Sequence, residues 1–310
     1  MADLNSDQME GIAFSPAHIT GFFKAELENQ KKSEDLGSQG AGFSIQKGVK
    51  TTVKVRKKTE YDISDFHLKI TGYQTDNTQV SEYVIQKFLS LTNDECFVDI
   101  EHEINVPVGY GLGSSGAVAL SLGLALNQAL KTDLTKIEVG YIAHEAEIKC
   151  KTGLGDVLAS FDGGFEIRTK GGAPGKGIVK KIKTEYDSVI IICFSPISTK
   201  RFINERLSSI NGLGGKMVTK LEKSKNIIEF QDMSLEFAKY INVITPKMLS
   251  VIKDLNENGI NCGVAMFGET VFSLVPRNKE DKVIDILKKY DDGIIITSKI
   301  DNTGARITKQ

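Results

Sequence analysis

The sequence has no excess of charge of either sign. Of its 310 residues, 39 are lysine or arginine and 40 are aspartate or glutamate, which gives a formal net charge of −1. A chain without a global field does not recruit nucleic acid or an anionic membrane through its overall charge. We therefore expect a small-molecule partner, with no nucleic acid and no membrane.

Cysteines are few, and no hydrophobic run is long. The four cysteines, at positions 96, 150, 193 and 262, are too far apart for a CxxC redox pair or a zinc knuckle, so they are expected to be buried thiols. The longest apolar stretches, such as SVIIICF and AVALSLGLAL, fall short of the roughly 20 residues that a membrane helix needs. Residues 1–10 have no basic segment followed by an apolar one, so they predict a flexible tail and not a secretory signal. A reducing, cytoplasmic location fits these absences.

The balance of apolar and charged residues is that of a folded globular protein. The first half of the chain is expected to begin with β-strands. ECFVDIEHEINV alternates, with Val98, Ile100 and Ile104 on one side and charged residues on the other, which predicts a one-sided strand of the antiparallel type. AVALSLGLALNQAL is apolar nearly all round, which predicts a helix buried in the core. TKIE at 135–138 has the spacing of a capping box and predicts a second helix to about residue 149.

The second half has a different order of elements. It comprises a strand at SVIIICF, two or three helices between 201 and 258, strands at CGVAMF and TVFSLV, a helix at KEDKVIDILKKY and a strand at GIIITS. The order βαββαβ with inserted helices predicts a ferredoxin-like half. The glycine-rich GGAPGKG at 171–177 is the expected boundary, which divides the chain after its tail into 11–170 and 171–310.

The loop PVGYGLGSSGA, directly before the buried helix, carries the strongest chemical signal. Glycines let backbone N–H groups approach an anion, and a helix start adds about half a positive charge. The two serines add hydroxyls for phosphate or for Mg²⁺, a role we assign to Ser115. The loop therefore predicts an ATP-binding site made of Pro107, Gly109, Gly111, Leu112, Gly113, Ser114, Ser115, Gly116 and Ala117.

Three other motifs or roles compete for this loop. Gly111, Gly113 and Gly116 also satisfy GxGxxG, the dinucleotide fingerprint of an oxidoreductase. A Rossmann first strand is continuously apolar, whereas the strand before this loop alternates. The Walker pattern is not matched by GAPGKG or GLGGKM. A tight turn that packs a helix onto a sheet stays open as a purely structural alternative.

Two acidic residues are candidates for the chemistry. Glu145 shares a helical stripe with Ile137, Tyr141 and Ile148, where a carboxylate must be paired or bind a metal. It is therefore a Mg²⁺-ligand candidate, with a structural salt bridge as the alternative. Asp156 follows a pair of glycines and is a candidate to accept a proton from a substrate hydroxyl, although it is also a favoured helix N-cap residue.

Together these elements resemble the GHMP family of small-molecule kinases over nearly the whole chain beyond residue 10. PVGYGLGSSGA is similar to the family's phosphate loop, and Glu145, Asp156, Gly163 and Gly164 have the spacing of the metal-binding glutamate, catalytic aspartate and glycine pair of mevalonate kinases. The resemblance implies an α+β, two-domain fold, with an N-terminal half like a ribosomal S5 domain and a ferredoxin-like C-terminal half. It also implies ATP and Mg²⁺ as cofactors.

Within that family, FSPAHITGFF at 14–23 resembles the first motif of archaeal pantoate kinases, enzymes of coenzyme A synthesis. Where other members have an arginine, this chain has His18, which makes His18 a candidate for contacting the substrate or the transferred phosphoryl group. A core histidine bonded to backbone is the alternative. The family's third, glycine-rich motif is reduced here to GVAMFGETVFSL. The resemblance implies a substrate site of His18, Thr20, Gly155, Lys200 and Arg201.

The sequence thus predicts transfer of the γ-phosphoryl group of ATP to the primary hydroxyl of pantoate, giving 4-phosphopantoate, with Asp156 and His18 as the catalytic residues. Alternatives are a kinase of the same fold that acts on mevalonate or homoserine, and a catalytically silent nucleotide-binding regulator. A homodimer is a possible assembly.

Overall fold

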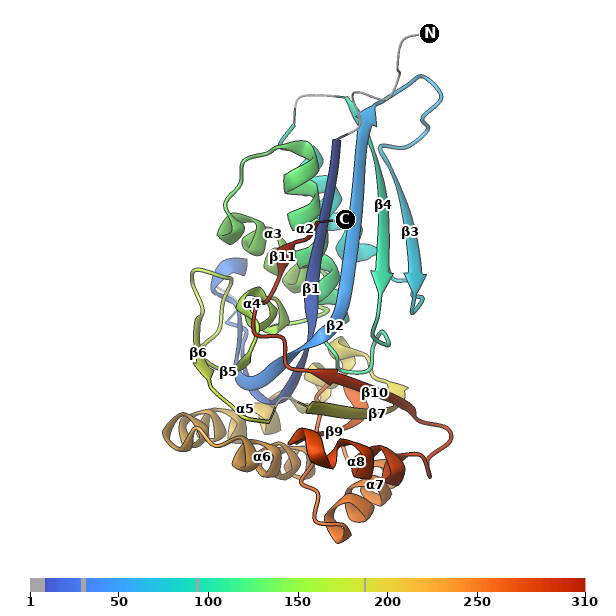
Figure 1. Cartoon of the computed structure of the whole chain (residues 1–310). Coiled ribbons are helices and arrows are strands. Elements are labelled where there is room, and N and C mark those ends of the chain that lie inside the picture. The colour runs from blue at the N-terminus through green and yellow to red at the C-terminus, as the bar shows by residue number, and fades with distance from the viewer. Residues whose placement is uncertain (1–8, 29–31, 93–94, 187, 310) are drawn as a thin grey trace.

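The computed structural model describes residues 9–28, 32–92, 95–186 and 188–309. The molecule is built on two β-sheets, one below the other in Figure 1. The first sheet has seven strands and the second has four. Helices cover both sheets, so the predicted α+β class is confirmed.

The first sheet is built mainly from the N-terminal half. Its strands are β1 (Met9–Glu26), β2 (Gly37–Lys57), β3 (Phe66–Gly72), β4 (Cys96–Ile104), β5 (Phe165–Lys170), β6 (Ile178–Ile182) and β11 (Arg306–Ile307). Its helical elements are η1 (Ser33–Asp35), α1 (Gln79–Leu89), α2 (Ser114–Leu130), α3 (Lys136–Cys150) and α4 (Asp156–Asp162).

The second sheet has the predicted ferredoxin-like order, β10-β7-β9-β8. Its strands are β7 (Ser188–Pro196), β8 (Gly263–Val264), β9 (Gly268–Val275) and β10 (Ile294–Lys299). The accompanying helices are α5 (Thr199–Ser224), α6 (Ile227–Tyr240), α7 (Pro246–Glu257), η2 (Arg277–Lys279) and α8 (Glu280–Leu287). The three helices between β7 and β8 confirm the inserted helices expected there.

The expected boundary after residue 170 does not coincide with the edge of the first sheet. Residues 171–177 link β5 to β6, and these strands pair as neighbours in that sheet. At the other end of the chain, β11 pairs with β1. Of the predicted tail, residues 1–8 lie outside the described residues, and Met9 and Glu10 belong to β1. The boundary between the two halves depends on which strands hydrogen-bond within the sheet. Local composition does not reveal that pairing.

Strand β4 has the predicted one-sided pattern, with alternate residues buried from Val98 to Ile104. It pairs antiparallel with β2 but parallel with β3. The expectation of an antiparallel strand was therefore right for one neighbour and wrong for the other. The reason is that α1 lies between β3 and β4 in the chain and returns it to the same end of the sheet, as a crossover helix does.

Helix α2 is buried, as its sequence predicts, because it lies between the first sheet and helices α1 and α3. Gly11 of β1 allows this close approach, since a Cβ at that position would lie 2.0 Å from the carbonyl oxygen of Ala125. The predicted capping box of α3 is present, with Thr135 and Glu138 each accepting from the other's backbone N–H.

Aromatic rings join the two halves. Phe43 of β2 lies 5.1 Å from Phe272 of β9 between ring centroids, and Phe165 of β5 lies 4.9 Å from Phe230 of α6. Such pairs add to the free energy of burial and favour defined ring geometries. The contact holds β2 and β5 of the first sheet against the C-terminal half.

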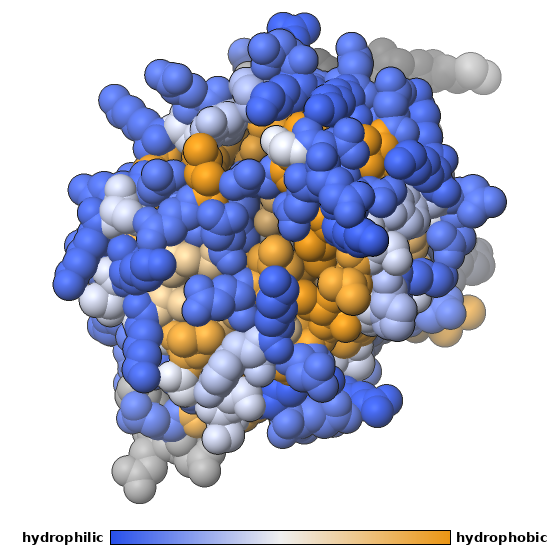
Figure 2. Space-filling model, turned by 90° about the horizontal axis from the view of Figure 1, so that it is seen from below, coloured by the Kyte–Doolittle hydropathy of each residue, from blue (hydrophilic) through white to orange (hydrophobic). Residues whose placement is uncertain are grey.

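The far end of the second half presents a mixed surface. Seen from below, hydrophobic side chains gather at the centre of this face within a polar surround (Figure 2). Helices α6 and α7 lie at this end (Figure 1), and they carry the exposed hydrophobic residues Ile228, Tyr240 and Leu249. In the described part of the chain, no helix combines the length and the apolar character needed to cross a membrane.

A buried histidine makes stability depend on pH. His102 of β4 is 1% exposed, with Nδ1 2.8 Å from Thr51 Oγ1 and Nε2 3.1 Å from Ser81 Oγ. Burial lowers the pKa of His102 to about 4, so the unfolded chain binds this proton more readily than the folded chain does. The contribution of neutral His102 to the free energy of unfolding is present in full above pH about 6.5 and is lost as pH falls toward about 4. It totals on the order of 3 kcal/mol.

We expect His102→Gln to lose less stability than the wild type between pH 7 and pH 4, because the variant lacks this titration. Urea unfolding at several pH values measures the difference. Parallel curves for the two proteins would contradict the assignment.

Candidate active site

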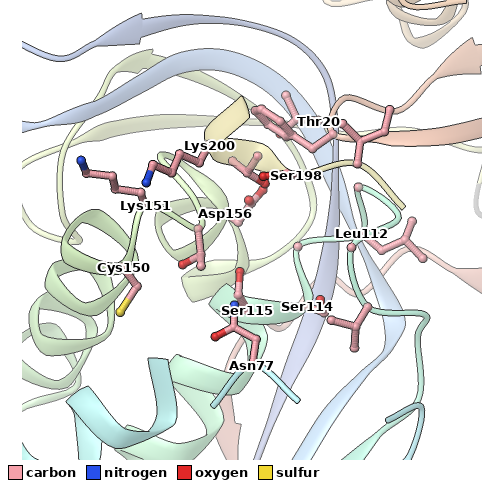
Figure 3. A pocket seen from close by; sticks show the side chains of 18 of the residues that line it. Thr20, Asn77, Leu112, Ser114, Ser115, Cys150, Lys151, Asp156, Ser198 and Lys200 are labelled. Carbon is pink, nitrogen blue, oxygen red and sulfur yellow. The ribbon is translucent and has the colours of Figure 1, made fainter. Parts of the chain in front are cut away.

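A cleft of about 440 Å³ opens where the phosphate loop meets the second half. Side chains from β1, from the end of α3, from the start of α4 and from the segment before α5 face it (Figure 3). The sequence-predicted residues that line it are Thr20, Gly109, Gly111, Leu112, Gly113, Ser114, Ser115, Asp156 and Lys200.

The phosphate loop ends in the first turn of α2. Gly113 is the N-cap residue with φ 60°, and Ser114 and Ser115 are the first two helical residues. N–H groups in a first helical turn have no partner within the helix, so they are free to bind an anion at this point. Three predicted loop residues have supporting positions. Pro107 and Gly116 are buried, and the N–H of Ala117 donates to the carbonyl of Gly113.

The reduced third motif braces the phosphate loop. A Cβ at Gly268 would lie 2.0 Å from the carbonyl oxygen of Tyr110, and one at Gly111, where φ is 76°, would lie 2.2 Å from that of Met266. Thr270 Oγ1 also donates to the Tyr110 carbonyl, at 2.8 Å. Phe267 lines the cleft itself. The Phe267 side chain therefore forms part of the cleft wall, and Gly268 lets the backbone of this motif pack closely against the phosphate loop.

Asp156 lies at the floor of the cleft, held by His18. Asp156 Oδ1 is 2.9 Å from His18 Nδ1, and the Asp156 side chain is 12% exposed. Gly155, not Asp156, is the N-cap residue of α4, so the capping alternative is wrong. The carboxylate is therefore available to a bound molecule on one side and anchored on the other.

His18 is bonded to side chains, which makes the alternative of a core histidine bonded to backbone wrong. Its Nε2 lies 3.0 Å from Glu166 Oε1, and its backbone N–H donates to the Leu112 carbonyl at 3.0 Å. Burial by itself would lower the pKa of His18, but the hydrogen bonds to Asp156 and Glu166 outweigh it and raise the pKa. Arg168 Nη1 bonds to the same Glu166 oxygen.

The prediction that Glu145 binds the metal does not fit its surroundings. Glu145 Oε2 forms an ion pair with Lys87 Nζ of α1 at 3.1 Å, which is the salt-bridge alternative. The carboxylate beside the phosphate loop is that of Glu147, 1% exposed, which accepts hydrogen bonds from Thr152 Oγ1 at 2.5 Å and from Ser115. Two residues along a helix correspond to a rotation of about 200°, so the two glutamates face opposite ways.

Glu147 and Asp156 form an acidic pair. A Cβ built at Gly153 would lie 1.9 Å from Glu147 Oε2 and 3.4 Å from Asp156 Oδ2, so both carboxylates flank this glycine. Glu147 Oε2 is buried without a hydrogen-bond partner. Burial, together with the charge of Asp156, raises the pKa of Glu147 to about 7. A cation at this point would relieve both the missing bond and the repulsion.

This donor set fits Mg²⁺. Two carboxylates and the Ser115 hydroxyl are hard oxygen ligands, and Mg²⁺ in phosphoryl-transfer sites takes one or two carboxylates together with substrate phosphates. Within the described ranges, no group of three or more histidine, cysteine, aspartate or glutamate residues could hold a metal by itself.

The two basic residues in the first turn of α5, Lys200 and Arg201, have different positions. Lys200 lines the cleft, as does Lys151 at the end of α3 (Figure 3). The Arg201 side chain is 79% exposed, and its Nε donates to Glu205 at 2.6 Å on the same helix. Of the two, only Lys200 is placed to contact a ligand in this cleft.

Lys200→Ala should raise the KM of ATP about two- to fivefold, because an exposed ammonium group contributes up to about 1 kcal/mol to an ion pair. Arg201→Ala is the matched control and should leave the KM within error. Initial rates across an ATP series measure both values. An effect confined to Arg201 would contradict this placement.

Residues of the site that the sequence did not predict include Lys151 and Thr152, which line the cleft, and Glu147, Glu166 and Arg168, which lie buried behind it. Glu166 and Arg168 alternate with Phe165 and Ile167 in β5, a pattern that normally indicates a solvated face. Here all four side chains are buried, since Phe165 and Ile167 belong to the core and the two charged residues lie beside His18. The alternating pattern therefore predicts a strand, but it does not predict that the charged side chains of that strand are buried.

Comparisons with known proteins agree with this geometry. Residues 79–164, which include the phosphate loop, α3 and Asp156, match the GHMP kinases N terminal domain. The chain belongs to the GHMP kinase family, a class of ATP-dependent small-molecule kinases.

Its relatives within that family include pantoate kinases. It is 34% identical to the pantoate kinase of Methanocaldococcus jannaschii, over 89% of this chain and 96% of that one. It is 28% identical to the pantoate kinase of Thermococcus kodakarensis, over 93% and 96%. A solved structure described as a phosphotransferase related to the CoA biosynthesis pathway superimposes with a TM-score of 0.86 at 25% identity, covering 97% of this chain and 99% of that one.

Proposed function

We propose that this chain is a pantoate kinase, which transfers the γ-phosphoryl group of ATP to the primary hydroxyl of pantoate. The observation that carries the proposal is the Asp156 carboxylate, which faces the cleft opposite the start of α2 while His18 holds its other side. The likeness to pantoate kinases over almost the full chain supports the choice of acceptor.

The reaction needs little covalent chemistry from the protein. The hydroxyl oxygen of pantoate forms a bond to the γ-phosphorus, the bond from that phosphorus to the β,γ-bridging oxygen breaks, and ADP leaves. The hydroxyl proton passes to Asp156, whose Oδ2 is the oxygen not bonded to His18. Backbone N–H groups at the start of α2 stabilise charge on the phosphates.

Mg²⁺ would be held by Ser115 and Glu147, with Asp156 nearby, and it would neutralise charge on the phosphate oxygens when bound. Glu147 is proposed in place of Glu145 because its Oε2 is the buried acceptor without a partner. Thr152 and Ser115 already fix the orientation of that carboxylate.

Arg168 is our candidate for the pantoate carboxylate. Its guanidinium is fully buried, and among the described residues its Nε is the one buried side-chain nitrogen without a hydrogen-bond partner. A Cβ at Gly155 would lie 2.9 Å from that Nε and 2.5 Å from Ser38 Oγ. The absence of a side chain at Gly155 thus lets Arg168 and Ser38 pack against the start of α4. Arg168 reaches the cleft through Thr20, whose Oγ1 accepts from its Nη2 at 3.3 Å.

The test is ADP release from MgATP with pantoate, with homoserine and mevalonate assayed in parallel. We expect a rate that depends on pantoate and a product that carries phosphate on the primary hydroxyl, as shown by ³¹P NMR. Equal or faster turnover of another acceptor would support a kinase of the proposed mechanism, with that acceptor and not pantoate as its substrate. ATP binding without turnover of any acceptor would favour a nucleotide-binding regulator.

A further inference from the structure

Glu166 of β5 contacts the site through another residue. Its Oε1 lies 3.0 Å from His18 Nε2 and also accepts a hydrogen bond from Arg168 Nη1. All three side chains are fully buried. With Asp156, they form a continuous chain of four ionisable groups that runs from the cleft floor into the interior.

The charges along this chain alternate. Arg168 is positive, Glu166 negative, His18 positive when protonated and Asp156 negative, so each group has a neighbour of opposite sign. Removal of one member leaves its neighbours unpaired, and a buried charge without a partner is strongly unfavourable. The groups that face His18 are Asp156 from α4, Glu166 and Arg168 from β5, and Thr20 from its own strand.

The His18 ring has little freedom to move. Both ring nitrogens are engaged, so a flip or rotation would break the bond to Asp156 or the bond to Glu166. A Cβ at Gly42 would lie 2.6 Å from His18 Nε2, and one at Gly113 would lie 3.3 Å from Asp156 Cγ, so the backbone packs against the ring at Gly42 and against the carboxylate at Gly113. The orientation of Asp156 therefore depends on a ring whose far side is held by Glu166.

We propose that Glu166 is a positioning residue for phosphoryl transfer: it fixes the His18 ring and, through it, the Asp156 carboxylate that receives the hydroxyl proton. The inference rests on the proposed kinase function. Glu166 itself touches neither substrate. Its effect is therefore on kcat, because misplacing a catalytic group slows chemistry without weakening the binding of the nucleotide.

Kinetics of three variants test the proposal. Glu166→Ala should lower kcat roughly 10- to 100-fold, the range seen when a group that orients a functional residue is removed, with the KM of ATP within about twofold. Glu166→Gln, whose amide oxygen can still accept both bonds, should recover most of that loss. The control is Glu26→Gln, a half-buried glutamate that bonds to Gln39 and Gly171 and should leave kcat unchanged.

Other outcomes would overturn the proposal. An unchanged kcat in Glu166→Ala would do so directly. A rise in the KM of pantoate at constant kcat would mean that Glu166 acts only by orienting Arg168 for substrate binding, and not by positioning His18. Equal losses in kcat for the alanine and glutamine variants would show that its charge, and not the position of the ring, is what matters.

Proton NMR of the imidazole N–H groups gives a readout that does not need turnover. The chain has four histidines, and the His18 signals are identified by their loss in His18→Gln. We expect protected low-field signals in the wild type and in Glu166→Gln, and their loss in Glu166→Ala. If the wild type proved inactive on pantoate, these spectra would still report whether Glu166 holds the ring, and unchanged spectra in Glu166→Ala would refute that.

Discussion

Asp156→Asn will lower kcat for phosphoryl transfer by roughly 10²- to 10⁴-fold, the range expected for loss of a general base. The amide keeps the size of the carboxylate but cannot accept the hydroxyl proton as readily. Because we place the phosphates at the start of α2, we expect the Kd of ATP to stay within about threefold. Initial rates and calorimetric titration of ATP measure the two effects separately.

Asp162→Asn is the matched control for this variant. Asp162 is the last residue of the same helix, and its side chain is 61% exposed. We expect its kcat to equal that of the wild type. Wild-type turnover in Asp156→Asn would remove Asp156 from the mechanism, and loss of ATP binding in that variant would mean that the residue supports the site and not the proton transfer.

Glu147→Gln will raise the Mg²⁺ concentration needed for half-maximal activity, by roughly 10- to 100-fold. An amide oxygen is a weaker ligand for a hard cation than a carboxylate oxygen, and the buried Glu147 Oε2 has no other partner. Glu145→Gln is the matched control, on the same helix. It alters one ion pair with Lys87 and should leave the Mg²⁺ dependence unchanged.

The same variant has a signature in the metal-free protein. The pKa of Glu147 is raised by burial from an ordinary value of 4.5 to about 7, so the folded state binds the proton more tightly than the unfolded state. Its contribution to stability is fully present below pH about 4.5 and is lost as pH rises through about 7. We therefore expect metal-free Glu147→Gln to gain Tm relative to the wild type as pH rises from 5 to 8.

Two results would contradict the assignment of the metal to Glu147. One is a Mg²⁺ dependence that changes in Glu145→Gln and not in Glu147→Gln. The other is a difference in Tm between Glu147→Gln and the wild type that does not vary with pH, since that would place no titrating carboxyl at this position.

Much of this protein is determined by the sequence itself, because the signals are local. The phosphate loop is recognisable since glycines and serines directly before an apolar helix have few other uses, and the capping box fixes the start of α3 within a few residues. The order βαββαβ follows from periodicity along the chain, and it defines the ferredoxin-like half. The first motif at residues 14–23 indicated the acceptor. A homodimer and a cytoplasmic location stay predictions.

Only the tertiary structure decided which charged side chains face the site. Glu145 and Glu147 are both plausible ligands along the chain, and Lys87, a residue of another helix, pairs with one of them and leaves the other beside Ser115. The alternation in β5 looks like a solvated strand, but the pairing of β5 with β2 places Glu166 and Arg168 beside His18. Burial and charge pairing act between residues that lie tens to more than a hundred positions apart, so no local pattern contains them.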